Sequence, residues 1–374
     1  MASTMPIPEQ FAKVLRGVEN QTYQTAWSLP GRFYVDDEWF NIENQQLFAQ
    51  QWVCVGRVEE LENPGDFFTC EIAGQPLLLT HGKDGKRRAL SNICLHRGTI
   101  LVEESGSADR FTCPYHHWSY DAAGQLLTAP RMTGRKDFTS GECRLPEYFI
   151  EDWMGFIFVC IGSNPKDLNK QLQKATELIQ PYHLEEMKTL YRADECWEVN
   201  WKCLLENFME GYHLSPLHRT TLHKVNPTRL CKHIEPGDIH FGYTVGFTSR
   251  LPEERVGHSD LTEEQMDTCV MVAIAPGLAI GIGSDYCSFL CLQPVSAGRV
   301  KVKIGLLFHG DNWPDEVVAE AVSLFNDTMA EDKAVLLRVQ KGLAAPSHAP
   351  GPLAKKDFEG TIFDFFRYLS KSLL

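Results

Sequence analysis

The segment from Asn200 to His218, NWKCLLENFMEGYHLSPLH, constrains the fold of this 374-residue chain more than any other. Its first half has the apolar spacing of an amphipathic helix that is buried on one side. The same segment carries two histidines and three acids or amides, Glu206, Asn207 and Glu210. Polar groups are placed so densely in a buried helix only where they have partners, so we predict a metal centre here.

The spacing of the two histidines decides whether they can bind one ion. Glu210 and His213 are three residues apart and share one helix face, whereas His213 and His218 are five apart and about 140° out of phase on an unbroken helix. Pro216 lacks an N–H and disfavours the α conformation at Ser215, so we expect the helix to end there and His218 to turn back toward His213. Two histidines and one carboxylate are the ligand set with which non-heme Fe(II) binds oxygen.

Composition is that of a globular protein large enough for two domains, with 43% hydrophobic and 23% charged residues. The chain has 49 acidic against 36 basic residues and no block rich in lysine or arginine, so we expect no nucleic-acid partner. The start lacks a signal-peptide pattern, and no apolar run approaches the roughly 18 residues of a membrane span. Together with twelve scattered cysteines, this predicts a cytoplasmic protein that is not bound to a membrane.

Hydrophobic periodicity divides the chain into three parts. Residues 1–47 contain two helical stretches, the first at Glu9–Val18. Residues 48–162 have a period of two, with short runs such as VCVGRVEEL and MGFIFVCI between turn signals, and are predicted to form a small all-β unit. Residues 163–374 mix the two periods.

The third part surrounds the histidine segment. A helical stretch at Asn164–Leu190 and a strand at Tyr191–Val199 precede it, and four β-type runs between His240 and Gly310 follow it. An amphipathic helix is expected at Pro314–Leu343, and the polar stretch Glu253–Glu264 is expected to be a loop. We predict an α+β fold in which the all-β unit is an insert, the N-terminal helices pack on the third part, and an antiparallel sheet carries a long C-terminal helix.

A second candidate metal site lies inside the all-β unit. Cys94-Leu95-His96 is followed, after sixteen residues, by Cys113-Pro114-Tyr115-His116, so two loops together offer two thiolates and two imidazoles. This set fits a structural zinc ion, a 2Fe–2S cluster with two histidines on one iron, or a coincidence of residue types. The C-x-H spacing, which is unusual for zinc fingers, and the histidine segment downstream favour the iron–sulfur cluster.

The two motifs together resemble those of a known family. The motif CLHRGTIL…CPYHHWSYDAAG resembles the Rieske signature, and NWKCLLENFMEGYHLSPLH resembles the mononuclear iron motif of the α subunits of Rieske non-heme iron oxygenases. The resemblance covers nearly the whole chain, with both motifs in the family's order. It implies an N-terminal Rieske domain, a catalytic domain of the helix-grip (START-like) type and a head-to-tail homotrimer.

The resemblance also implies the ligands. Those of the cluster are two cysteines and two histidines: Cys94, His96, Cys113 and His116. The mononuclear iron takes His213, His218 and an aspartate on the late helix, which AEDKAVLLRVQKGL places at Asp332, with Asp327 as the competing candidate. Glu210 stands where most members have an aspartate that links the cluster histidine of one subunit to the iron histidine of the next, so we assign it the catalytic role of that residue.

Glutamate at this position is similar to the oxygenases of carnitine and glycine betaine, as are LPGRFYVDDEWFNIENQQLFAQQWVCVG and EDKAVLLRVQKGL. The resemblance implies a terminal oxygenase that uses O2 and electrons from NAD(P)H. Because the chain has no G-x-G-x-x-G after a strand, a separate flavin and iron–sulfur reductase is expected to deliver them.

The favoured reaction is monooxygenation of a small quaternary amine, with C–N cleavage or N-demethylation. Alternatives are hydroxylation of an aromatic acid or amine, an electron-transfer Rieske protein and a zinc-stabilised binding module. Aromatic residues of the late strands are candidates to line the substrate pocket, as a cation–π cage or as apolar walls: Phe241, Tyr243, Phe247, Tyr286 and Phe289.

Of the remaining aromatic and histidine residues, Tyr115 and Trp118 are expected to pack over the cluster. His117 is expected to lie at the surface or behind the ligands. His223, His233 and His240 are candidates for pocket or exit-path residues, although lone histidines in strands and loops more often have structural roles.

Overall fold

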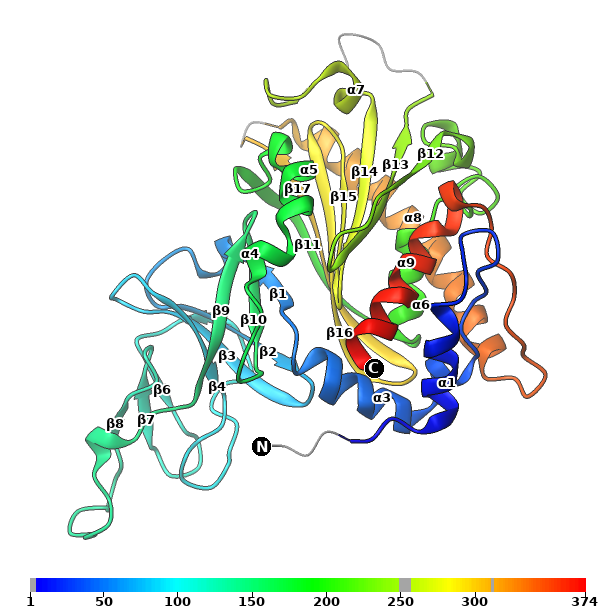
Figure 1. Cartoon of the computed structure of the whole chain (residues 1–374). Coiled ribbons are helices and arrows are strands. Elements are labelled where there is room, and N and C mark those ends of the chain that lie inside the picture. Colours follow the sequence, from blue (N-terminus) through cyan, green and yellow to red (C-terminus); the bar gives the residue numbers. More distant parts are fainter. Residues whose placement is uncertain (1–4, 249–256, 311–312) are drawn as a thin grey trace. The chain divides into compact units, whose positions relative to one another are not determined.

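The computed structural model describes residues 5–248, 257–310 and 313–374, and the chain forms two compact units (Figure 1). The larger unit comprises Met1–Leu47 and Asp167–Leu374, and the smaller one comprises Phe48–Lys166. The smaller unit is therefore an insert between two parts of the larger one. The predicted α+β architecture with an inserted all-β unit is confirmed.

The smaller unit is built from strands. A seven-stranded sheet has the order β1-β10-β9-β4-β3-β2-β5, and a three-stranded sheet has the order β6-β7-β8. The strands are β1 Val53–Arg57, β2 Asp66–Ile72, β3 Gln75–His81, β4 Arg87–Ser91, β5 Gly106–Ser107, β6 Arg110–Thr112, β7 Ser119–Asp121, β8 Leu126–Thr128, β9 Glu147–Trp153 and β10 Phe156–Cys160. Strand β1 is shorter than the run VCVGRVEEL, because the Glu60 carboxylate accepts the Arg57 N–H at 2.9 Å and Val58–Leu61 form a 3-10 turn.

The larger unit is organised on an antiparallel sheet of seven strands in the order β11-β17-β16-β15-β14-β13-β12. The strands are β11 Met187–Trp197, β12 Cys231–Ile234, β13 His240–Gly246, β14 Thr268–Ile274, β15 Leu278–Ile282, β16 Tyr286–Ser296 and β17 Arg299–His309. Strand β12 was not predicted, and β11 begins four residues before the predicted Tyr191. The run DTCVMVAIAPGLAIGIG divides into two strands around Pro276.

Helices of the larger unit cover one face of this sheet, where α6, α8 and α9 lie together (Figure 1). The helices are α1 Glu9–Val18, α2 Arg32–Val35, α3 Asp37–Glu43, α4 Leu168–Gln171, α5 Gln173–Ile179, α6 Trp201–Met209, α7 Glu263–Met266, α8 Asp315–Leu343 and α9 Lys356–Leu373. The predicted helices at Glu9–Val18 and Pro314–Leu343 are confirmed. Part of the predicted loop Glu253–Glu264 lies outside the described residues, and its end begins α7 instead.

Helix α9 was not predicted, although its sequence has the helical spacing. Ile362, Phe365, Phe366 and Leu369 follow the i, i+3, i+4, i+7 pattern and are all buried. The helix packs against β12, β13 and α1, and its Ser370 hydroxyl donates to the Leu15 carbonyl at 3.0 Å. It is therefore a core element of the larger unit.

A buried ion pair joins the N-terminal helices to α6. Lys202 Nζ lies 2.7 and 2.8 Å from the two carboxylate oxygens of Glu43, and the two side chains are 0% and 1% exposed. The indole N–H groups of Trp39 and Trp201 also donate to Glu43, at 2.8 and 3.0 Å. Four hydrogen-bond contacts therefore compensate the carboxylate for the water that it has lost.

We predict that Lys202→Met destabilises the larger unit by roughly 3–5 kcal/mol, because it leaves the Glu43 carboxylate buried without a cation. Urea unfolding followed by tryptophan fluorescence measures the loss. The control is Lys333→Met, which breaks the partly exposed pair of Lys333 with Glu195, where N and O are 2.6 Å apart. It is expected to cost less than about 1 kcal/mol, and equal losses in the two variants would refute the prediction.

Candidate metal centres and substrate cavity

Helix α6 is fixed at its N-terminus by Asn200. The Asn200 side chain accepts the Lys202 N–H at 3.0 Å, which is an N-cap, and donates to the Ala297 carbonyl at 2.7 Å. Its backbone N–H donates to Gln340 of α8 at 2.8 Å. These contacts set the position of α6 relative to α8, and with it the position of the histidines that follow.

The helix ends at Met209, six residues before the predicted end at Ser215. The cause is α9, because the Thr361 hydroxyl donates to the Met209 carbonyl and the Gly211 N–H donates to the Phe358 carbonyl at 3.1 Å. Gly211 also lies so close to β12 that a Cβ there would be 2.3 Å from Cys231 Sγ. The prediction that Glu210 and His213 share a helix face is therefore wrong, since both lie in the turn after the helix.

The turn nevertheless brings the three predicted iron ligands together. The Leu217 N–H donates to the His213 carbonyl at 2.9 Å and closes a single turn around Pro216. As a result of this turn, His213 Nε2 lies 3.7 Å and His218 Nε2 lies 3.2 Å from Asp332 Oδ1. One ligand atom from each of these three residues lies within 4.8 Å of the others.

Helix α8 supplies the carboxylate. Met329, Asp332 and Leu336 form its buried stripe, so Asp332 faces inward between two apolar residues, with 7% of its surface exposed. The competing candidate Asp327 is exposed on the same helix. The two aspartates thus lie on different faces of α8, and only Asp332 faces the two histidines.

The outer nitrogen of each histidine faces a carboxylate. His213 Nδ1 is hydrogen-bonded to Glu210 Oε1, and His218 Nδ1 lies 2.6 Å from Glu331 Oε2. Glu331 is held in turn by the hydroxyl of Thr221, which donates to it at 2.7 Å. A carboxylate on Nδ1 keeps the ring proton there and leaves a lone pair on Nε2, as in metal-binding histidines.

Glu331 was missed by the sequence reasoning, although it is adjacent to Asp332. No motif identifies it, because its partner His218 is more than a hundred residues away in the chain.

The inner atoms of this centre fit a cation. His218 Nε2 and Asp332 Oδ1 are buried and, within the described part of the chain, neither has a hydrogen-bond partner. Burial lowers the pKa of His213, but the carboxylates of Glu210 and Asp332 outweigh it and raise that pKa above its usual value. An excess of negative charge around two lone pairs is the environment that a divalent ion satisfies.

A cavity of about 350 Å³ lies against the three ligands, between α6, α8 and the sheet. Its walls are mainly apolar and include three of the five predicted aromatics, Tyr243, Phe247 and Tyr286. Phe289 is not among the lining residues, because alternate residues of β16 face opposite sides of the sheet, and it covers Gly305 on the other side. Phe241 is covered by α9, with its ring centroid 5.6 Å from that of Tyr368. These two assignments are therefore corrected.

In the smaller unit, two loops bring the predicted cluster ligands together. Cys94 and Cys113 are 2% and 1% exposed, and His96 Nδ1 lies 3.2 Å from His116 Nδ1 at the partly exposed rim. Burial raises the pKa of the Cys113 thiol, but the backbone N–H groups of Tyr115 and His116 outweigh it and lower that pKa below its usual value. Two inner thiols and two outer imidazoles fit a 2Fe–2S cluster with histidines on one iron.

The two loops have the same backbone design. Cys94 N–H donates to the Thr99 carbonyl and Cys113 N–H to the Trp118 carbonyl, at 2.8 and 2.7 Å. Each loop then turns through a left-handed residue four positions after its cysteine, Gly98 with φ 75° and His117 with φ 58°. The role of His117 thus lies in its backbone, because its side chain is exposed.

Aromatic rings pack on the two histidines that are predicted to bind the cluster. Trp118 stacks on His96, with ring centroids 4.9 Å apart and planes 9° apart, and the Tyr115 ring lies 3.8 Å from that of His116. The Tyr120 hydroxyl also lies 3.4 Å from Cys94 Sγ and accepts the Leu95 N–H at 3.1 Å. Rings that fix the imidazoles and a hydroxyl beside a sulfur are features that tune a cluster's potential.

The other polar residues of the histidine segment have separate positions. Glu206 faces Tyr34, whose hydroxyl donates to it at 2.8 Å, and burial raises the pKa of this carboxyl to about 8. Asn207 lines the cavity. Glu206 is thus a buried structural acid, and it is not a ligand of the centre.

The three later histidines lie outside the centre. His223 Nδ1 is 2.9 Å from Ser215 Oγ, and His233 Nε2 is 2.6 Å from Asp364 on α9. His240 is buried, and this burial lowers its pKa to about 4. None of the three is among the described residues that line the cavity.

Comparison with known families identifies the class of protein. Residues 51–148 match the Rieske 2Fe-2S domain, and residues 181–371, about half of the chain, match the catalytic domain of the ring hydroxylating alpha subunit. The chain therefore belongs to the ring-hydroxylating α-subunit family, and the resemblance predicted from the two motifs is confirmed. Membership implies a Rieske cluster in the smaller unit and a mononuclear iron in the larger one.

Similar proteins include two bacterial oxygenase subunits. The chain is 34% identical over 200 residues to the carnitine monooxygenase oxygenase subunit of Escherichia coli (strain K12), a match that covers 52% of this chain and 53% of that protein. It thus spans about half the length of this relative. It is 25% identical over 386 residues to the glycine betaine monooxygenase oxygenase subunit of Pseudomonas aeruginosa (strain UCBPP-PA14), covering 93% of this chain and 90% of that protein.

A solved structure shares the whole fold. It is a quaternary ammonium Rieske monooxygenase, with a TM-score of 0.85, 22% identity and full coverage of both chains. As for membranes, none of the helices in the described part of the chain combines the length and the apolar character needed to cross a bilayer.

We predict that Glu331→Ala weakens iron binding by roughly 10–100-fold, because His218 loses the carboxylate that orients its ring. Iron content after dialysis against a graded chelator measures this, and the visible absorbance of the cluster is expected to stay unchanged. Asp327→Ala removes an exposed acid from the same helix and serves as the matched control. Equal iron affinity in the two variants would show that Glu331 does not position the ligand.

Proposed function

We propose that this protein is the terminal oxygenase component of a Rieske-type monooxygenase. The observation that carries the proposal is the convergence of His213, His218 and Asp332 on the wall of an apolar cavity. A pure electron-transfer protein has no use for a second ligand set with a cavity beside it. A zinc-stabilised binding module would likewise leave this ligand set without a role.

Each group has a proposed task. Cys94, His96, Cys113 and His116 would hold the 2Fe–2S cluster, which accepts and donates one electron at a time. His213, His218 and Asp332 would hold the mononuclear iron, which supplies oxygen activation when bound. Glu210 accepts N–H groups from His213 and Tyr212, so it fixes the ring of one ligand and the backbone that carries it.

The electrons are proposed to come from NAD(P)H through a separate flavin and iron–sulfur reductase, and the protein is proposed to act as a homotrimer. The solved relative is described in terms of inter-subunit electron transfer, which supports an arrangement in which two subunits share one path. Glu210 would lie on that path, because its carboxylate already contacts one iron-ligand histidine.

The favoured substrate is a small quaternary amine. Tyr243, Phe247 and Tyr286 line the cavity, and aromatic faces bind quaternary ammonium groups by cation–π attraction. Asp332 is the only carboxylate among the described lining residues, and these include no lysine or arginine. A substrate carboxylate would thus have no basic partner among them, so ammonium compounds with and without a carboxylate must be compared.

The alternative is hydroxylation of an aromatic acid or amine, since the same aromatic walls also accept a flat ring. We expect C–N cleavage or N-demethylation when the chemically reduced protein reacts once with oxygen in the presence of carnitine, glycine betaine, choline or aromatic acids. Mass spectrometry of the products distinguishes the two reactions. A hydroxylated ring would support the alternative reaction. If none of these substrates gives an oxidised product, the proposal of an oxygenase is refuted.

We predict that Glu210→Gln keeps both metal centres, because the amide has nearly the same shape, but lowers turnover by a factor of about 100 or more, because electron delivery requires the carboxylate. The amide places an NH₂ donor against N–H groups that now meet a carboxylate oxygen. Cluster absorbance, iron content and single-turnover product yield measure the two effects. Glu206→Gln, in the helix that precedes this turn, replaces a buried acid that is not a ligand of the centre, and it is expected to leave turnover unchanged; equal activity in the two variants would contradict the role of Glu210.

A further inference from the structure

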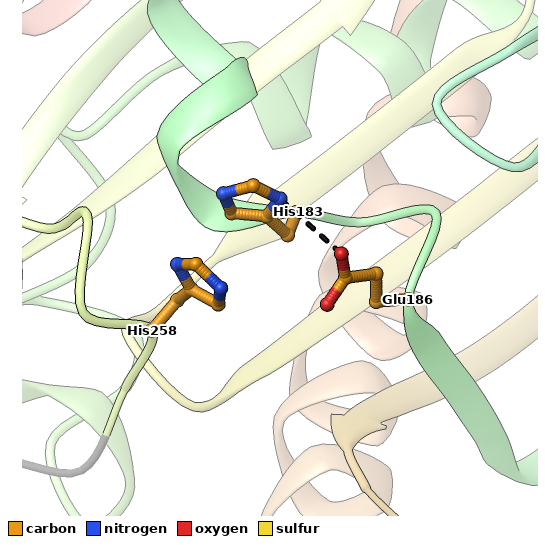
Figure 2. A group of neighbouring side chains, drawn as sticks. All are labelled: His183, Glu186 and His258. Carbon is orange, nitrogen blue, oxygen red and sulfur yellow. Dashed lines mark ion pairs between the residues drawn. The ribbon is translucent and has the colours of Figure 1, made fainter.

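A second group of metal-ligating side chains lies on the larger unit, outside the centre described above (Figure 2). His183 follows the 3-10 turn Gln180–Tyr182, Glu186 precedes β11, and His258 precedes α7 in the chain. One ligand atom from each lies within 4.8 Å of the others. The side chains of His183, His258 and Glu186 are 20%, 28% and 59% exposed, so an ion from solvent can reach them.

His183 is held in the way that metal-binding histidines are held. Its Nε2 lies 2.9 Å from Asp260 Oδ2, so this carboxylate can accept the ring N–H and leave the lone pair on Nδ1. Nδ1 in turn lies 3.6 Å from Glu186 Oε1 and 3.7 Å from Glu185 Oε1. Two ligands bound to one zinc ion at about 2.1 Å in tetrahedral geometry are about 3.4 Å apart, which is close to these separations.

The backbone of His183 provides an independent observation. Its φ of 45° and ψ of 52° lie in the left-handed region, which residues other than glycine seldom adopt unless their surroundings hold them there. Here the chain turns from Tyr182 toward β11 and directs the imidazole at His258, with ring centroids 3.7 Å apart. Figure 2 shows the two rings and the Glu186 carboxylate grouped around a common space.

A third imidazole is close but is engaged elsewhere. The His309 ring centroid lies 6.1 Å from that of His258, and His309 Nε2 lies 2.9 Å from the Tyr182 carbonyl. It is therefore not counted among the ligands.

We propose that His183, His258 and Glu186 bind a zinc ion, with Asp260 as the positioning residue of His183. Two imidazoles and one carboxylate are an established zinc ligand set, and Glu185 or water can complete the tetrahedron. The ion would join the start of β11 to the segment before α7, which are far apart in the sequence. Because such a site forms only in the folded chain, zinc would stabilise the folded state. This proposal does not depend on the oxygenase function.

The test uses the holoenzyme, with the cluster assembled and the catalytic centre loaded with iron, because that centre also has a zinc-compatible ligand set. Calorimetric titration with zinc chloride is followed by metal analysis after dialysis. We expect one zinc ion per chain in addition to the iron, unchanged iron content and a higher melting temperature. Asp260→Asn is expected to weaken zinc binding by roughly 10–100-fold.

The ligand variants are His183→Asn and His258→Ala, which should abolish both the zinc uptake and the rise in melting temperature. Asparagine is chosen because it tolerates the left-handed backbone, so the variant keeps its fold. Iron content and cluster absorbance equal to wild type verify the fold of each variant. His348→Ala, at a half-buried histidine outside the group, is the matched control and should bind zinc as wild type does.

Three results would overturn the proposal: a wild-type holoenzyme that takes up no zinc beyond its iron, zinc that only replaces the iron, or ligand variants that bind zinc as tightly as wild type.

Discussion

The larger unit is built around a buried group of carboxylates and imidazoles whose arrangement fits a cation. His218 Nε2 and Asp332 Oδ1 lie 3.2 Å apart in a buried position, and neither has a hydrogen-bond partner among the described residues. Glu210 and Glu331 bring two more carboxylates to the outer sides of the imidazoles. Leaving such groups uncompensated costs several kcal/mol each, so this arrangement fits a site for a positively charged ion.

The helices that hold this centre also determine where α6 begins and ends. The Thr361 hydroxyl of α9 donates to the last carbonyl of α6, and the Phe358 carbonyl of α9 accepts the Gly211 N–H. These contacts force the chain into the turn that carries His213 and His218. The inward stripe of α8 then brings Asp332 to the same point, and Gln340 of α8 binds the N-terminus of α6. Three helices are thus locked to one another around the ligands, and the remaining space between them and the sheet becomes the cavity.

The sequence predicted those features that depend on residues close to one another in the chain. The motifs and their resemblance to the family predicted both ligand sets and placed the carboxylate at Asp332, and in the structure the buried stripe of α8 separates Asp332 from Asp327. The predictions failed where a residue's structure depends on an element that is distant in the sequence. They extended α6 past Met209 because they did not foresee the contact with α9, they missed Glu331 because its partner is remote, and they placed Phe289 in the cavity because the pleat of β16 relative to the sheet was not known. Strand β12 was too short, at four residues, to show a period.

The surface group around His183 has the same arrangement of histidine and carboxylate as the buried centre. The two sites differ in burial, and therefore in the chemistry that an ion could carry out there. In both, a carboxylate at hydrogen-bond distance fixes the proton on one ring nitrogen, at 2.9 Å for Asp260 and 2.6 Å for Glu331, and so leaves the other nitrogen to a metal. The buried ligands face an apolar cavity, where a dielectric lower than that of water strengthens electrostatic interactions, so an ion there can take part in a reaction. The group at His183 is open to solvent, which completes the coordination of an ion with water and screens its charge. An ion at that position would act by joining two segments of the chain, and its effect belongs to stability and not to catalysis.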